Sequence, residues 1–196
     1  MLKIQVGLTS YSLNLKIIKM NILILSGSPR KHGNTDLIVE AFVKGIPEHH
    51  NVEIVSVHDN KVAPCIGCNG CFKSENNTCV QKDDMIGIYE KMKQADMLVI
   101  ASPVYFYGLS AQVKAIIDRC HNPIRDTFNI KKTALLLVGA STLPELFDSI
   151  ITQYHLCLNF FHLEDAGYVV ARGVKDKGDI KNTKALNEAY ELGRSL

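Results

Sequence analysis

Hydroxyl, glycine and basic residues gather in residues 26–35, between an apolar run and a helical pattern. Ser26, Ser28 and Thr35 supply three hydroxyls, and Arg30 supplies a positive charge. The start of a helix leaves backbone N–H groups without hydrogen-bond partners, and such groups bind phosphate readily. The segment therefore predicts a phosphate-binding loop at the start of a helix.

The kind of phosphate follows from what this segment lacks. It has no Gly-Lys-Ser/Thr ending, which excludes the phosphate loop of nucleoside triphosphatases. It also has no Gly-x-Gly-x-x-Gly, which argues against the pyrophosphate of a dinucleotide. A terminal phosphomonoester, such as that of FMN, fits better. The alternative is a turn rich in serine, glycine and proline that caps a helix and binds nothing.

A second segment, residues 102–110, carries three consecutive aromatic residues, Tyr105, Phe106 and Tyr107. We expect this segment to be a loop after a strand, where these side chains would expose a large apolar area unless a planar group covered them. A proline stiffens the start of the loop, and a glycine near its end permits close approach of a ligand. The isoalloxazine ring of a flavin suits such a loop. The alternative is that the aromatic residues pack on a neighbouring helix.

Four of the six cysteines lie close together, as Cys65, Cys68, Cys71 and Cys79. Three thiolates separated by two residues each can surround one face of a [4Fe–4S] cubane, and the fourth can close it. A structural zinc site usually takes two such pairs from separate places, and disulfides are rare in a reducing cytosol, so both are weaker interpretations. A loop whose thiols bind no metal stays open as the alternative.

Apolar runs typical of strands alternate with helical patterns along the chain. The runs are residues 22–25, 52–57, 97–101, 134–138 and 168–171. The helical patterns are residues 35–46, 85–94, 110–121, 143–158 and 180–194. The first, third and fourth runs are apolar on both faces, which is typical of central strands in a parallel sheet covered by helices. The order predicts a three-layer, doubly wound α/β domain with a five-stranded parallel sheet.

Residues 58–84 have no periodic pattern, and so long a structureless segment in a compact domain usually carries function. In doubly wound sheets, ligands bind beyond the carboxyl ends of the strands, where the strand order reverses, as flavodoxin binds FMN. The phosphate segment, this long segment and the aromatic segment follow the first, second and third predicted strands. We therefore expect all three segments to lie at one edge of the sheet.

The composition is that of an ordinary globular protein, with 46% hydrophobic and 21% charged residues among 196. This length suffices for one α/β domain with a full core. The net charge of +2 is made of interspersed signs, and no helical pattern is both basic and amphipathic. Nucleic acids and membranes are therefore not expected as partners. The pair His49 and His50 is predicted to be a solvated turn.

Residues 1–19 differ from the rest, with three lysines and no acidic residue. Polar residues interrupt their apolar ones, so the segment has neither the apolar core of a signal peptide nor the length of a membrane span. We expect residues 1–19 to be a dispensable extension, with Met20 as the natural start. Residues 20–196 would then form the domain, with a cytoplasmic location.

The chain resembles the NAD(P)H-dependent FMN reductase family, whose members are flavodoxin-like, from Met20 to its carboxyl end. Three segments carry the resemblance: SGSPRKHGNT, PCIGCNGCFKSENNTCVQKDDM and SPVYFYGLSAQVKAIIDR. The resemblance implies that the phosphate of FMN lies against Ser26, Ser28, Pro29, Arg30, Asn34 and Thr35. It implies that the flavin ring lies against Pro103, Val104, Tyr105, Phe106, Tyr107 and Gly108.

The cysteine spacing is similar to that of the iron–sulfur flavoproteins, a branch of this family in which such a loop holds a [4Fe–4S] cluster near FMN. The ligands implied here are Cys65, Cys68, Cys71 and Cys79. Relatives often keep such a cysteine-rich loop without metal, and the seven-residue gap before the last cysteine is long for the cluster motif. The presence of a cluster therefore stays open.

The resemblance implies hydride transfer from NAD(P)H through FMN to free flavin, a quinone, or another small-molecule or protein acceptor. It also implies a homodimer or homotetramer. The cofactor performs this chemistry, so no catalytic acid or base is expected from the chain itself. Two alternatives remain: an electron carrier with FMN and a [4Fe–4S] cluster, and a flavin-binding module without catalysis.

Overall fold

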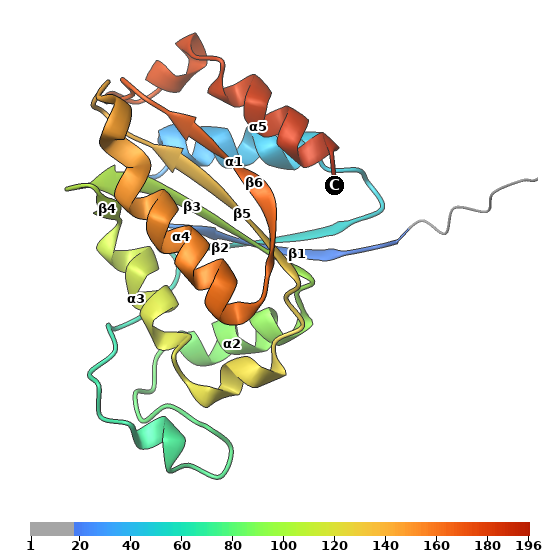
Figure 1. Cartoon of the computed structure of the whole chain (residues 1–196), viewed down its shortest axis with the longest axis vertical. Helices are drawn as coiled ribbons and strands as arrows, with labels where there is room; N and C mark the ends of the chain where they lie inside the picture. Colours follow the sequence, from blue (N-terminus) through green and yellow to red (C-terminus); the bar gives the residue numbers. More distant parts are fainter. Residues whose placement is uncertain (1–17) are drawn as a thin grey trace, which may run out of the picture.

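A five-stranded parallel sheet in the order β2-β1-β3-β5-β6 forms the centre of the computed structural model, which describes residues 18–196 (Figure 1). A short sixth strand, β4, pairs antiparallel with β3. The strands are β1 (Asn21–Ser26), β2 (Asn51–Ser56), β3 (Met97–Tyr105), β4 (Gly108–Leu109), β5 (Lys132–Val138) and β6 (Glu164–Ala171). The predicted doubly wound, flavodoxin-like α/β fold is confirmed. Of the predicted extension, residues 1–17 lie outside the described chain.

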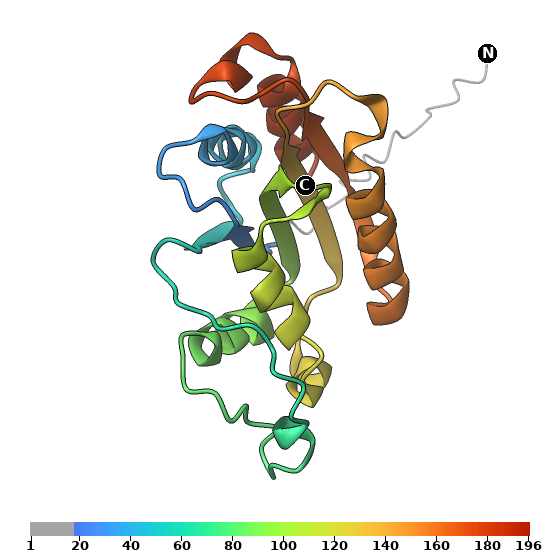
Figure 2. The ribbon, with the colours of Figure 1, turned by 90° about the vertical axis from the view of Figure 1, so that its left-hand side faces the viewer.

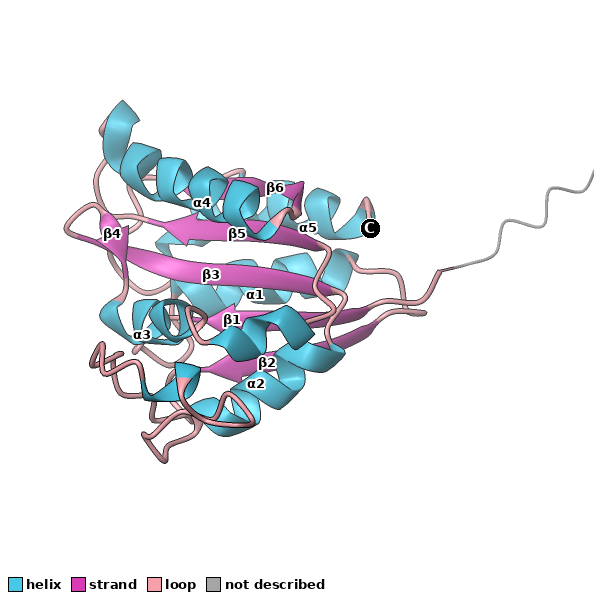
Figure 3. Cartoon of the chain, turned by 60° about the horizontal axis from the view of Figure 1, so that its bottom comes forward, coloured by secondary structure: helices cyan, strands magenta, loops and turns pink. Residues whose placement is uncertain are grey.

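Helices cover both faces of this sheet, which gives three layers (Figure 2). Helices α1 and α5 pack on one face, and α2, α3 and α4 pack on the other (Figure 3). The α-helices are α1 (Asn34–Gly45), α2 (Met85–Gln94), α3 (Ala111–Arg119), α4 (Asp148–Phe161) and α5 (Ala185–Arg194). Short 3-10 helices are η1 (Gly70–Phe72), η2 (Pro123–Thr127), η3 (Pro144–Phe147) and η4 (Asp179–Asn182). Within residues 18–196, no helix is long and apolar enough to cross a bilayer.

The apolar run of β1 explains why the sheet needs helices on both sides. Successive side chains of a strand point to opposite faces. Ile22 and Ile24 pack with α1 and α5, whereas Leu23 and Leu25 pack with α2 and α3. All four side chains are at most 2% exposed. Burial on both faces is what the continuous apolar pattern predicts.

Most predicted elements have somewhat different bounds in the structure, and three of the differences have a clear form. The helix predicted over residues 143–158 begins as η3 at Pro144 and continues as α4 to Phe161. The helix predicted over residues 180–194 is divided into η4 and α5. Strand β6, predicted over residues 168–171, begins earlier, at Glu164. Its first residues pair with Lys132 and Thr133 of β5. They are polar, which the apolar pattern could not reveal, because β6 is an edge strand and its side chains there are not buried.

His50 corrects the prediction of a solvated turn at residues 49–50. Its side chain is buried, and its Nδ1 accepts a hydrogen bond of 3.0 Å from the backbone N–H of Met20. The carbonyl of Met20 in turn accepts the N–H of Asn51 at 2.9 Å. Burial is the main cause that lowers the pKa of His50 below its ordinary value. The lowered pKa favours the neutral imidazole, whose Nδ1 can accept a hydrogen bond.

The long segment after β2 contains no strand or α-helix up to residue 84, and one ion pair fixes it to the body of the protein. The carboxylate of Asp83 accepts hydrogen bonds from the guanidinium of Arg119 and, at 2.9 Å, from the backbone N–H of Ala63. Burial, the largest single cause, raises the pKa of Asp83, but the hydrogen bonds from Arg119, Ala63 and Met85 and the charge of Arg119 together outweigh it, so the net pKa is lowered. The Arg119 side chain is only 1% exposed, which makes this pair a buried one.

A close approach of helix α3 to the end of β1 requires glycine at position 27. A Cβ atom there would lie 2.7 Å from Cβ of Val113 and 3.0 Å from the carbonyl oxygen of Ala101. We expect Gly27→Ala to lower the free energy of unfolding by about 1–3 kcal/mol through overpacking. Gly87→Ala is the matched control, because nothing lies within 4 Å of its new Cβ and alanine favours helices. Urea unfolding of both variants measures this, and equal stabilities would contradict it.

The pH dependence of stability tests the Asp83–Arg119 pair. Because the pKa of Asp83 is lowered in the folded state, the pair contributes stability above the ordinary aspartate pKa of about 4. That contribution disappears as the pH falls through the folded pKa. We expect Asp83→Asn to lower the free energy of unfolding by about 3 kcal/mol at neutral pH and to flatten its dependence on pH below about pH 4.

The control, Glu188→Gln, breaks an exposed pair with Lys184 and should change the dependence of stability on pH little. Urea unfolding across this range measures both, and parallel profiles for Asp83→Asn and the unaltered chain would refute the prediction.

Candidate functional site

The turn between β1 and α1 is held in shape by its own side chains. The hydroxyl of Ser28 accepts the N–H of Arg30 at 3.1 Å. The carboxylate of Asp36 accepts the N–H of Gly33 at 3.2 Å and the hydroxyl of Ser26 at 3.3 Å. These hydrogen bonds organise the turn without any ligand. Asp36 was missed by sequence reasoning, although an acidic residue in the first turn of a helix is a common partner of backbone N–H groups there.

The structure brings all the predicted phosphate-binding residues to this turn, but it uses some of their side chains internally. The amide of Asn34 donates to the carbonyl of Asp176 at 2.7 Å and accepts the N–H of Gly178 at 2.9 Å. Thr35 is buried, whereas Pro29 and Arg30 are exposed. In the part of the chain that the structure describes, the backbone N–H groups of Asn34 and Thr35 have no acceptor. The donors available to an anion are therefore backbone N–H groups, beside the exposed guanidinium.

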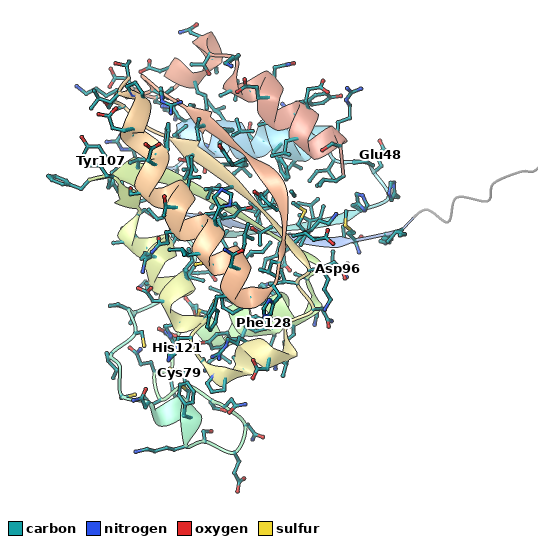
Figure 4. All side chains as sticks on the ribbon, viewed as in Figure 1. Glu48, Cys79, Asp96, Tyr107, His121 and Phe128 are labelled. Atoms are coloured by element: carbon teal, nitrogen blue, oxygen red, sulfur yellow. The ribbon has the colours of Figure 1, made fainter. Side chains whose placement is uncertain are left out.

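The aromatic segment is a β-hairpin and not the predicted loop. Strand β3 continues to Tyr105 and turns back through β4, with Val104 opposite Leu109 and Tyr105 opposite Gly108. Valine and tyrosine favour extended backbone, so their side chains extend the strand beyond the apolar run. The hairpin projects from the end of β3, where Tyr107 points away from the body of the protein (Figure 4).

The tip of this hairpin is strained and exposed. Phe106 and Tyr107 both have positive φ, 49° and 61°, as a type I′ turn requires. Asparagine and glycine usually occupy such positions, and bulky residues there are outliers. Phe106 is fully exposed, and the hydroxyl of Ser149 on α4 donates to the carbonyl of Tyr107. Strain of this kind gathers at ligand-binding sites.

Ser110 joins the hairpin to the phosphate turn. Its hydroxyl donates to the carbonyl of Gly27 at 2.6 Å and caps α3 by accepting the N–H of Val113 at 3.4 Å. Its own N–H donates to the hydroxyl of Ser102 at 3.0 Å, and both serines are buried. Strands β1 and β3 are parallel neighbours from which β2 and β5 extend in opposite directions, so the strand order reverses there. The two predicted flavin segments therefore meet where ligands of doubly wound sheets bind.

The four clustered cysteines line one pocket at the carboxyl end of α3, and the expectation that they lie with the other two segments at one edge of the sheet was wrong. The pocket is closed by residues of the loop and by the carboxyl end of α3, and its lining includes Cys65, Cys68, Cys71, Cys79, Arg119 and Asn122. The rings of Phe72 and His121 contact each other in a tilted arrangement with centroids 5.4 Å apart, which links the loop to the residues that follow α3. Cys79 lies beside His121 in Figure 4. Burial, and the nearby thiols of Cys79 and Cys65, raise the pKa of Cys71.

The cysteine pocket offers hydrogen-bond donors as well as thiols. Nε and Nη2 of Arg119 and Nδ2 of Asn122 are buried with no partner in the described chain. Burial lowers the pKa of Arg119, but the hydrogen bonds and charges of Asp83 and Cys79 together outweigh it, so the net pKa is raised. Such donors suit sulfur acceptors, so these residues fit an iron–sulfur cluster. Among residues 18–196, no three histidine, cysteine or acidic side chains converge closely enough to hold a single metal ion. The exposed Cys65 and Cys68 would have to turn inward to bind a cluster.

Comparison with known proteins gives a consistent result. Residues 20–172 match the family described as NADPH-dependent FMN reductase. An iron–sulfur flavoprotein of Methanocaldococcus jannaschii is 36% identical over 191 residues, which cover 90% of this chain and 95% of the relative. An iron–sulfur flavoprotein of Archaeoglobus fulgidus is 36% identical over 184 residues, which cover 90% of this chain and 79% of the relative.

A solved structure supports the same fold. The NAD(P)H:quinone oxidoreductase from Methanothermobacter marburgensis superposes with a TM-score of 0.72 over 91% of this chain and 97% of its own. Its sequence identity is 18%, so this likeness concerns the fold alone. The family match covers most of the chain, and the relative from M. jannaschii is similar over nearly its whole length. The chain belongs to the NADPH-dependent FMN reductase family.

Proposed function

We propose that the chain is an FMN-dependent oxidoreductase that takes electrons from NAD(P)H and passes them through the flavin to an acceptor. The observation that carries this proposal is the hydrogen bond from the Ser110 hydroxyl to the Gly27 carbonyl. It joins the end of the aromatic hairpin to the turn that precedes α1. The phosphate would lie at residues 27–35, held by the N–H groups of Asn34 and Thr35 and by Arg30. The ring would lie against residues 103–108.

The chain's own part in this reaction is binding and orientation. When bound, FMN supplies the acceptor for hydride and the store from which electrons leave. The turn after β1 fixes the phosphate end, and the hairpin offers the exposed face of Phe106 to a planar ring. A ring that covers Phe106 would also bury apolar area that otherwise faces water. No side chain is needed as a catalytic acid or base.

Titration of the flavin-free protein tests the flavin site. We expect FMN to bind about 10–100 times more tightly than riboflavin, because charge-assisted hydrogen bonds to the phosphate contribute about 1.5–3 kcal/mol. Arg30→Ala should narrow this ratio, whereas Arg194→Ala, a remote and exposed change on α5, should not. Flavin fluorescence measures the affinities.

Anaerobic addition of NADPH or NADH to the FMN-loaded protein then tests the reaction. The proposed oxidoreductase loses its visible flavin absorbance. Bound FMN that neither nicotinamide reduces would contradict an enzyme and support a flavin-binding module without catalysis. Equal affinities for FMN and riboflavin would contradict the phosphate site itself.

A second candidate function is that of an iron–sulfur flavoprotein, in which a [4Fe–4S] cluster exchanges single electrons with the flavin. The specific observation in its favour is the pocket that Cys65, Cys68, Cys71 and Cys79 share with unpaired buried N–H donors. The archaeal relatives named as iron–sulfur flavoproteins are a second support. Both proposals use the same flavin site and differ in whether a second redox centre is present.

Iron analysis separates the two proposals. We expect the anaerobically purified chain to contain iron and acid-labile sulfide beside its flavin. Cys68→Ala should remove the iron and sulfide and leave FMN binding unchanged, because Cys68 lies in the loop and outside the flavin site. Cys157→Ala is the matched control, since Cys157 lies on α4. Stoichiometric FMN without iron in the unaltered protein would refute the cluster.

The remaining expectations rest on the family alone. We propose a cytoplasmic location and a homodimer or homotetramer for this chain, as the resemblance implies. The electron acceptor is proposed as a small molecule or a protein that reaches the flavin at the sheet edge, and nucleic acids and membranes are not proposed as partners.

A further inference from the structure

Two buried residues at the cysteine pocket hold donors that the fold does not use. The side chain of Arg119 is 1% exposed and Asn122 is 4% exposed, yet three of their nitrogen atoms have no acceptor in the described chain. Buried donors are almost always paired. Both residues line the pocket that contains the four cysteines. These three donors are therefore available to a group bound in the pocket.

Other atoms of these two residues make the hydrogen bonds that stabilise the fold. Nη1 of Arg119 donates hydrogen bonds to the carboxylate of Asp83 and, at 3.3 Å, to the carbonyl of Ala63. Oδ1 of Asn122 accepts the N–H of Ile124 at 3.0 Å and caps η2. This hydrogen bond fixes the orientation of the amide, so that Nδ2 is the atom left free. The free atoms are Nε and Nη2 of Arg119 and Nδ2 of Asn122.

The side-chain acceptors that line this pocket are the four cysteine sulfur atoms and the oxygen atoms of Asn69, Gln81, Tyr89 and Asp118, and the sulfur atoms suit these donors best when they are anionic. A guanidinium stays charged at every physiological pH, so its N–H groups favour anionic sulfur over a neutral thiol. Hydrogen bonds to the sulfur atoms of an iron–sulfur cluster raise its reduction potential, because they stabilise the more negative reduced form. The positive charge of Arg119 acts in the same direction.

We propose that Arg119 and Asn122 are positioning residues that donate hydrogen bonds to the sulfur atoms of a cluster held by Cys65, Cys68, Cys71 and Cys79, and so raise its midpoint potential. This inference rests on the proposed iron–sulfur cluster. It assigns to helix α3 a second role, since the residue at its carboxyl end faces a redox centre as well as the ion pair with Asp83.

The experiment compares full-length variants purified without oxygen. Arg119→Lys keeps the positive charge toward Asp83 but loses the planar set of N–H groups. Asn122→Asp keeps the acceptor for Ile124 and loses the amide donor. Arg125→Lys is the matched control, because Arg125 lies on η2 and does not line the pocket. Iron, acid-labile sulfide, FMN content and thermal unfolding are measured for each variant, and a mediated redox titration followed by electron paramagnetic resonance gives the midpoint potential.

We expect both pocket variants to keep their FMN and shift the cluster potential to more negative values. At a fixed solution potential, the ratio of reduced to oxidised cluster should fall about tenfold, which corresponds to a shift of about 59 mV in the midpoint potential of a one-electron couple. The control Arg125→Lys should match the unaltered chain. A merely structural role would change thermal unfolding or cluster content without this shift.

Two results would overturn the inference in distinguishable ways. An unaltered chain that binds FMN but no iron or sulfide would remove the cluster, and with it the role of both donors. A cluster whose potential is the same in the unaltered chain, Arg119→Lys and Asn122→Asp would leave the proposed cluster standing and overturn the hydrogen bonds alone.

Discussion

The hydrogen bond from the Ser110 hydroxyl to the Gly27 carbonyl is the contact on which the candidate flavin site depends. It joins the end of β1 to the start of α3, while the N–H of Gly27 donates to Ala101 on the neighbouring strand. Two turns that are 83 residues apart in the sequence are thereby fixed side by side. Only glycine at position 27 permits this distance, because a side chain would overlap Val113. The turn between β1 and α1 and the strained hairpin consequently lie together at one edge of the sheet.

Helix α3 connects this edge to the cysteine pocket. Ser110 caps its amino end at the candidate flavin site, and Arg119 ends it at the loop that carries the cysteines. Nine helical residues span about 14 Å, so the two regions are separated by roughly one short helix. A helix anchored by a buried hydrogen bond at one end and a buried ion pair at the other holds two loops at a fixed separation. Electron transfer between the proposed flavin and the proposed cluster would require such a fixed separation.

Local patterns in the sequence sufficed to predict the sheet and the turn between β1 and α1, because each depends on residues that are neighbours in the sequence. The hairpin was mistaken for a loop because its turn uses Phe106 and Tyr107, where pattern rules expect asparagine or glycine. His50 was misplaced because its partner, Met20, lies 30 residues away. Arg119 escaped attention because an arginine that ends an amphipathic helix normally faces solvent, and its partner Asp83 is 36 residues distant. Long-range polar pairs leave no periodic signal.

The burial of Arg119 is difficult to explain by stability alone. A buried ion pair often contributes less than an apolar replacement of similar volume, since removing two charges from water costs several kcal/mol for each ion. Each buried donor without an acceptor costs about 1–3 kcal/mol more, and this pocket contains three. The loop could have been fixed by an apolar contact such as that of Phe72 with His121. The burial of Arg119 beside four thiols is therefore better explained by the proposed cluster than by the stability of the fold.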